Sequence, residues 1–177
     1  MNYQNDVFDF FFKNKIPYWM GLRPAKGTIK FFLWILKCHI SFCNKKCHKW
    51  SKSTVRGYKR PSLFRLHLIL DEVVEIIDAL ITGNLEELAD STTDLLYVTF
   101  GMQVTYFIPS KETWNEVHRS NLTKDFKSDE RRKYKGENWT PPNMSIAIAE
   151  GRLRQSKEYK DAYNRRFRLH REDDLSE

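Results

Sequence analysis

Residues 70–98 read LDEVVEIIDALITGNLEELADSTTDLLYV. The stretch is rich in Leu, Ile and Val, which most proteins bury, yet it also carries eight carboxylates. They are Asp71, Glu72, Glu75, Asp78, Glu86, Glu87, Asp90 and Asp94. A segment that buries its apolar side chains needs a reason for so many charges on the rest of its surface.

Local signals divide this stretch into two helices. A first helix is predicted over about 62–80, with a serine as its N-cap, and TGN at 82–84 ends it. Asn84 followed three residues later by Glu87 predicts a capping box at the start of a second helix, which runs to about Tyr106. Two helices joined by so short a turn are expected to form an antiparallel hairpin.

Two further helices are predicted downstream, so the predicted fold class is all-α. Ser110 can cap a helix over about 111–121, and a last helix spans about 145–171 with Gly151 as its weak point. A polar loop, which includes residues 135–144, separates the two.

The carboxylates gather on one face of each helix. At about 100° per residue, three of them fall within about 60° on the first helix and three within a similar wedge on the second. The first wedge contains Asp71, Glu75 and Asp78, with Glu72 at its border. The second wedge contains Glu87, Asp90 and Asp94. In a hairpin these wedges can face each other.

Two facing acidic wedges repel each other, and a divalent cation would resolve the conflict. Several carboxylate oxygens suit Mg²⁺ or Mn²⁺, and inward carboxylates on facing helices are one way to build such a site. The alternative is a solvated acidic face on an amphipathic hairpin. The spacing by itself leaves both interpretations open.

The motifs resemble those of a known superfamily. DEVVE at 71–75, followed after eleven residues by ELAD at 87–90, resembles the signature E-E-x-x-E, spacer, E-x-x-D. It is typical of the all-α nucleoside triphosphate pyrophosphohydrolases, which include the MazG-like enzymes, the dimeric dUTPases and the phosphoribosyl-ATP pyrophosphohydrolases. Asp71 stands where Glu is usual. Segments 5–24, 116–126 (EVHRSNLTKDF) and 135–144 (KGENWTPPNM) resemble further elements of one MazG-like branch.

The resemblance implies a fold, a reaction and a set of site residues. The fold is a self-associating, four-helix-bundle-type MazG-like domain, a homodimer or homotetramer. The reaction is the Mg²⁺-dependent hydrolysis of a (d)NTP to (d)NMP and pyrophosphate, with Mn²⁺ as a substitute and dUTP or non-canonical nucleotides as candidate substrates. Glu72 is expected to be the catalytic base and Asp94 to lie behind the metal ligands. The expected metal ligands are Asp71, Glu75, Glu87 and Asp90, and the expected substrate-binding residues are Asn121, Lys124 and Arg119.

The charge is unevenly distributed along what is predicted to be one domain of 177 residues with a net charge of +7. Residues 1–70 hold 14 basic and 2 acidic side chains, whereas residues 71–130 hold 4 basic and 13 acidic ones. Residues 25–60 have no counterpart in the resemblance and are predicted to be a basic insertion, and 151–177 a charged helical extension. The alternative function is a non-catalytic helical binding module whose basic flanks contact nucleic acid or a protein partner. The stretch 10–70, which contains no acid, could also bind an anionic membrane surface.

The cysteines raise one more candidate site. Cys38, Cys43 and Cys47 lie close to His48 in the sequence, but their spacing is not that of a standard zinc finger, so zinc binding stays open. Three cysteines, no apparent export signal and no apolar run of about 20 residues predict a cytoplasmic protein.

Overall fold

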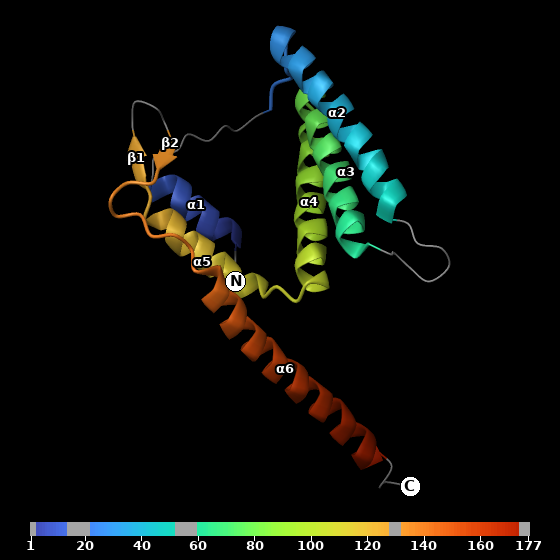
Figure 1. Ribbon diagram of the computed structural model, residues 1–177, viewed down its shortest axis with the longest axis vertical. Coiled ribbons are helices and arrows are strands. Elements are labelled where there is room, and N and C mark those ends of the chain that lie inside the picture. The colour runs from blue at the N-terminus through green and yellow to red at the C-terminus, as the bar shows by residue number, and fades with distance from the viewer. Residues whose placement is uncertain (1–2, 14–21, 52–59, 128–131, 174–177) are drawn as a thin grey trace. The chain divides into compact units, whose positions relative to one another are not determined.

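The computed structural model describes residues 3–13, 22–51, 60–127 and 132–173. The chain divides into two compact units, one of residues 18–106 and one that combines 1–17 with 107–177 (Figure 1). The sequence predicted one domain. In the structure the N-terminal helix packs with elements that follow residue 107.

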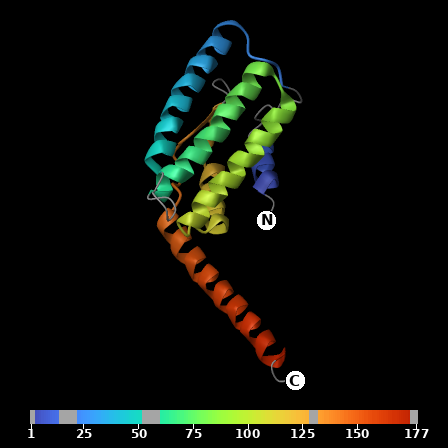
Figure 2. The same cartoon turned by 90° about the vertical axis from the view of Figure 1, so that its right-hand side faces the viewer.

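Three helices form the unit of residues 18–106: α2 (Gly27–Ser51), α3 (Pro61–Thr82) and α4 (Leu85–Thr105). They lie side by side with α3 in the middle, and α3 contacts both neighbours (Figure 2). The predicted acidic hairpin is therefore formed by α3 and α4, and α2 covers the other side of α3.

The turn between α3 and α4 follows the predicted capping chemistry. Asn84 accepts hydrogen bonds through its side-chain oxygen from the backbone N–H groups of Glu86 and Glu87, at 3.1 and 3.2 Å. Gly83 ends α3 with a φ of 74°, and its N–H donates to the carbonyl of Ala79 at 2.8 Å. This left-handed conformation is the usual helix end, and glycine adopts it without steric cost.

Prolines, rather than serines, stand at two helix starts. The prediction that a serine caps α3 is wrong, because the helix begins at Pro61 and Arg60 occupies the N-cap without a side-chain bond. Likewise Pro109 is the N-cap of α5, and Ser110 is already its first helical residue. Proline fits the first turn because it has no N–H that would need a partner there.

The segment predicted to be an insertion, 25–60, contributes a full helix to this unit. Along α2 and α3 the contacts run in antiparallel register: Lys37 pairs with Asp78, and the ring of His48 lies against that of His67, tilted by 52°, with centroids 4.3 Å apart. The helix buries Asn44, Cys47 and Ser51.

The second unit contains α1 (Tyr3–Lys13), α5 (Ser110–Leu122), β1 (Asp125–Lys127), β2 (Arg132–Tyr134) and α6 (Met144–Asp173). Figure 1 shows α1 beside α5. There Trp114 donates through Nε1 to Asp6 Oδ2 at 2.8 Å. The helix α6 runs through Gly151 without a break, and the missing side chain lets the helix lie against Pro109.

The all-α fold class is confirmed. Within the described ranges the strands are limited to the short antiparallel pair β1–β2. No helix in these ranges is long and apolar enough to cross a lipid bilayer. Residues 14–21, which belong to the N-terminal segment of the resemblance, and the end of the predicted C-terminal extension lie outside the described residues.

Candidate active site

Carboxylates of both α3 and α4 act electrostatically on Glu72. Burial is the main cause that raises the pKa of this carboxyl, and the nearby negative charges add to it. Those charges belong to Glu75, Asp94, Asp71 and Asp90, in decreasing order of effect. Two of the four come from α4, so the carboxylates of both helices act on one group of α3.

Glu72 also has a polar atom without a partner. Its Oε2 is buried and accepts no hydrogen bond from any described residue. A buried acceptor that lacks a donor costs free energy, and here the neighbouring charges are of the same sign. Helical angles place Glu72 at the border of the α3 wedge, and carboxylates of α4 also act on it there.

The remaining predicted ligands differ in exposure. Glu75, Glu87, Asp90 and Asp94 are exposed, and Asp71 is half-buried. Among the described residues, no three or more His, Cys, Asp or Glu side chains are arranged to hold one metal ion. The ligand atoms nevertheless suit Mg²⁺, because the face offers carboxylate oxygens. One of these, Glu72 Oε2, has no hydrogen-bond donor among the described residues.

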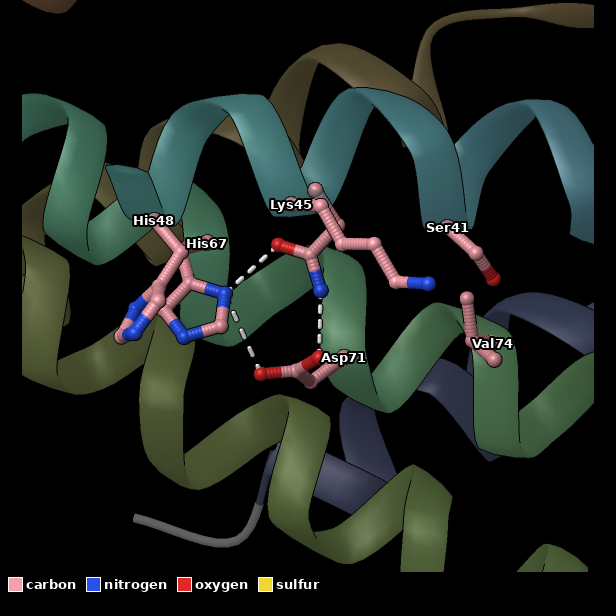
Figure 3. Close-up of a pocket in the computed structure, with 7 residues that line it drawn as sticks. Ser41, Lys45, His48, His67, Asp71 and Val74 are labelled. Atoms are coloured by element: carbon pink, nitrogen blue, oxygen red, sulfur yellow. Dashed lines mark hydrogen bonds and ion pairs between the residues drawn. The ribbon is translucent and has the colours of Figure 1, made fainter. Parts of the chain in front are cut away.

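Asp71 contacts Asn44 of α2 and His67 of α3, and the sequence did not predict these contacts. The Asn44 side-chain amide donates to Asp71 Oδ1, and His67 Nδ1 lies 3.2 Å from Asp71 Oδ2 (Figure 3). The spacing of His67 and Asp71, one helical turn apart, could have suggested their contact. Nothing in the sequence points to Asn44, which only the packing of α2 brings to α3.

Two basic side chains, Lys37 and Arg65, are bound to polar side chains of this unit. Lys37 Nζ lies 2.5 Å from Asp78 Oδ2, so this member of the predicted wedge is already paired. Arg65 crosses from α3 to α4 and donates through Nε to Thr105 Oγ1 at 2.8 Å. It passes so close to Gly101 that a Cβ there would lie 2.7 Å from Arg65 Nη1.

Two of the downstream motifs, 116–126 and 135–144, are hydrogen-bonded to each other in the second unit. Arg119 donates to Thr140 Oγ1 at 2.6 Å and to the Pro141 carbonyl at 3.0 Å. Ser120 donates through Oγ to the Thr140 carbonyl at 2.8 Å. The helix α5 therefore holds the polar loop in place.

Glu116 completes this contact. It accepts from the Asn143 N–H at 2.6 Å and from Arg119 at 2.8 and 2.9 Å. The Arg119 guanidinium, followed by the Asn143 N–H, lowers the pKa of Glu116 to about 2. Arg119, a predicted substrate-binding residue, is thus engaged in holding the loop. The other two, Asn121 and Lys124, are half-buried near the end of α5.

The three cysteines differ in exposure. Cys38 and Cys43 are exposed and Cys47 is buried. The ring of His48 contacts that of His67, and the described residues contain no metal-binding group that includes these side chains.

A family model matches the part of the chain that contains the α3–α4 hairpin. The model of the phosphoribosyl-ATP pyrophosphohydrolase family matches residues 39–121, which are 83 of the 177 residues. Residues 39–60, which belong to the predicted insertion, lie inside the bounds of this match. No curated protein and no solved structure matches the chain. The resemblance to the all-α nucleoside triphosphate pyrophosphohydrolase superfamily, of which the matched family is a member, is therefore confirmed for residues 39–121.

Proposed function

We propose that the chain is a Mg²⁺-dependent nucleotide pyrophosphohydrolase that converts a (d)NTP and water into (d)NMP and pyrophosphate. The family match supports an activity of this type. The observation that carries the proposal is the convergence of α3 and α4 carboxylates on Glu72, whose buried oxygen has no donor among the described residues.

Glu72 is the proposed general base. Its raised pKa makes it a better proton acceptor than an ordinary carboxylate. It takes a proton from the attacking water as the water oxygen bonds to the α-phosphorus. The bond from this phosphorus to the bridging oxygen breaks, and pyrophosphate leaves with that oxygen.

Glu75, Glu87 and Asp90 are the proposed ligands of the cation, with Asp94 behind them. When bound, Mg²⁺ would neutralise charge on the triphosphate. Without such neutralisation the acidic face would repel a polyanionic substrate, so these carboxylates bind the nucleotide through the cation they hold.

Asn121 and Lys124 are the proposed contacts to the nucleotide, as a hydrogen-bond partner and as a positive charge for its phosphates. We further propose that the chain acts as a homodimer or homotetramer, because α4 carries large exposed apolar side chains that a second copy would cover. They include Leu96, Tyr97 and Val104. We also propose that the protein is located in the cytoplasm.

A phosphate-release assay tests the activity. The protein is incubated with a panel of canonical and non-canonical (d)NTPs in the presence of inorganic pyrophosphatase, with and without Mg²⁺. We expect phosphate from at least one nucleotide, only with Mg²⁺ or Mn²⁺, and loss of it in Glu72→Gln. No phosphate from any nucleotide with either metal would contradict the proposal.

The alternative is a binding module, and the outer surface of α2 favours it. This helix carries Lys residues and no acid, and several large aromatic side chains on it are exposed. They include Phe31, Phe32, Trp34, Phe42 and Trp50. An inactive protein that binds nucleic acid, lipid vesicles or a protein partner through α2 would support this alternative.

A further inference from the structure

We propose that Asp71 is not a ligand of the cation but the end of a polar tie that joins α2 to the acidic helix, with Asn44 and His67 as the other members. The residue stands where the superfamily signature has Glu. The part of this inference that concerns the cation rests on the proposed function, whereas the tie itself does not.

The three side chains form a closed ring of contacts. Asn44, of which 6% is exposed, donates through its amide nitrogen to Asp71 Oδ1. His67 Nδ1 lies 2.6 Å from Asn44 Oδ1 and 3.2 Å from Asp71 Oδ2 (Figure 3). Both carboxylate oxygens of Asp71 are therefore engaged with protein groups, which distinguishes it from Glu72.

The chemistry permits one arrangement of hydrogens in this ring. If the Asn44 amide were reversed, its oxygen would face Asp71 Oδ1, and two acceptors would meet. With the amide as it stands, His67 Nδ1 faces two acceptors, Asn44 Oδ1 and Asp71 Oδ2, so it must carry a hydrogen. The buried Asn44 thereby has a partner for both ends of its amide, as a buried polar group requires.

Side-chain length explains why Asp occupies this position. Seven residues away on both helices, Lys37 and Asp78 pair at 2.5 Å, so the register of α2 on α3 is set at a second place. At this helix separation the short Asp71 side chain meets the Asn44 amide. A Glu would carry the carboxylate one methylene further and would displace Asn44 or turn away from it.

A double-mutant cycle tests the tie. The urea midpoints of Asn44→Ala, Asp71→Ala and the double variant are compared with wild type. We expect the double variant to unfold near the midpoint of the less stable single variant, because each substitution already breaks the same ring. Removing the Asp71 charge also relieves its repulsion of Glu72. This gain is the same whether Asn44 is present or replaced by Ala, so it cancels in the cycle. Additive losses, like those expected for Asn44→Ala combined with Asp94→Ala on α4, would overturn the tie.

Asp71→Glu provides a matched control of equal charge. We expect it to lower the urea midpoint in the wild-type background and to have no effect in Asn44→Ala, where the ring is already open. A ligand role predicts the reverse: stability is kept, and Mg²⁺ binding is equal or tighter.

Titration calorimetry with MgCl₂ tests the part that concerns the cation. We expect Asp71→Asn to keep the Mg²⁺ Kd within about twofold of wild type, and Asp90→Asn to weaken it by about tenfold or more. A loss in Asp71→Asn equal to that in Asp90→Asn would overturn the inference. If wild type binds no Mg²⁺, the proposed function fails at its cofactor, and the cycle still decides the tie.

Discussion

Lys37 Nζ donates to both carboxylate oxygens of Asp78, at 2.6 and 2.5 Å, and so links the middle of α2 to the last turns of α3. The pair is partly exposed, with 32% and 43% of the two side chains accessible. Solvent therefore screens its attraction. Its position on the shared face of the two helices makes it a test of whether α2 belongs to the folded unit.

We expect Lys37→Met to lower the free energy of unfolding by less than about 1 kcal/mol, the range for exposed ion pairs. The loss should shrink as NaCl is raised, because salt screens the wild-type pair. Urea denaturation at low and high salt measures both effects. Lys30→Met, at an exposed lysine near the start of α2, is the matched control. Equal behaviour of the two variants would indicate that the pair of Lys37 and Asp78 adds no stability in solution.

The acidic site predicts opposite effects on activity and stability. Glu75→Gln and Asp90→Asn should abolish turnover, because each removes an anionic ligand while its size is almost unchanged. In EDTA the Tm of each variant should equal or exceed that of wild type, because fewer like charges then surround Glu72. Scanning calorimetry and the phosphate assay measure the two properties. A solvated surface face would instead show no activity to lose.

Glu72→Gln should separate the base from the ligands. We expect it to abolish turnover while nucleotide binding in the presence of Mg²⁺, measured by calorimetry, is retained. It should also raise the Tm in EDTA, because the buried Glu72 carboxylate no longer carries a charge that its neighbours repel. Normal turnover in this variant would show that the base was assigned to the wrong carboxylate.

Gly83→Ala should destabilise the unit of residues 18–106 for two reasons. The backbone has a φ of 74°, which costs a residue other than glycine about 1 kcal/mol. The new Cβ would also lie 2.6 Å from Pro24 Cδ and Pro24 N, so the chain must shift. Gly27→Ala is the matched control, because its φ is 54° but no atom lies within 4 Å of the added Cβ. A larger loss for Gly83→Ala in urea denaturation isolates the clash with Pro24, and equal losses would contradict that contact.

Glu116 predicts a stability that depends on pH in the acidic range. The pKa of its carboxyl falls from an ordinary value of 4.5 to about 2 in the folded protein. A group whose pKa is lower in the folded state contributes stability above its unfolded pKa. That contribution is lost as the pH falls from about 4.5 through about 2.

We therefore expect Glu116→Gln to lower the Tm at neutral pH and to lessen the fall in Tm between about pH 5 and about pH 2. Thermal melts across this range measure the effect. Glu150→Gln, at an exposed glutamate of α6, controls for the loss of one charge. A Glu116→Gln profile parallel to wild type would indicate that the contact of Glu116 with Arg119 and the Asn143 N–H does not persist in solution.

Local chemistry in the sequence was enough to predict the helical hairpin and its acidic face. The Asn84 cap, the TGN turn and the spacing of the carboxylates involve only a few neighbouring residues. They can therefore be predicted without knowledge of tertiary contacts. The same motifs carried the resemblance that the family match confirms. Proline at the start of α3 was a local signal as well, but the neighbouring serine was given the capping role instead.

Tertiary structure alone decided that carboxylates of two helices act on Glu72 and that Asp71 is bound by Asn44 and His67. Glu72 and Asp71 are adjacent in sequence, but α4 carboxylates act on Glu72 and an α2 side chain contacts Asp71. Glu72 Oε2 has no hydrogen-bond donor among the described residues, whereas both oxygens of Asp71 have partners. Asn44 reaches Asp71 from 27 positions away. The sequence determined the helices and their charged faces, because those depend on neighbours within a turn or two. The pairing of the faces depends on which helices pack together, and that is settled by burial across the whole unit.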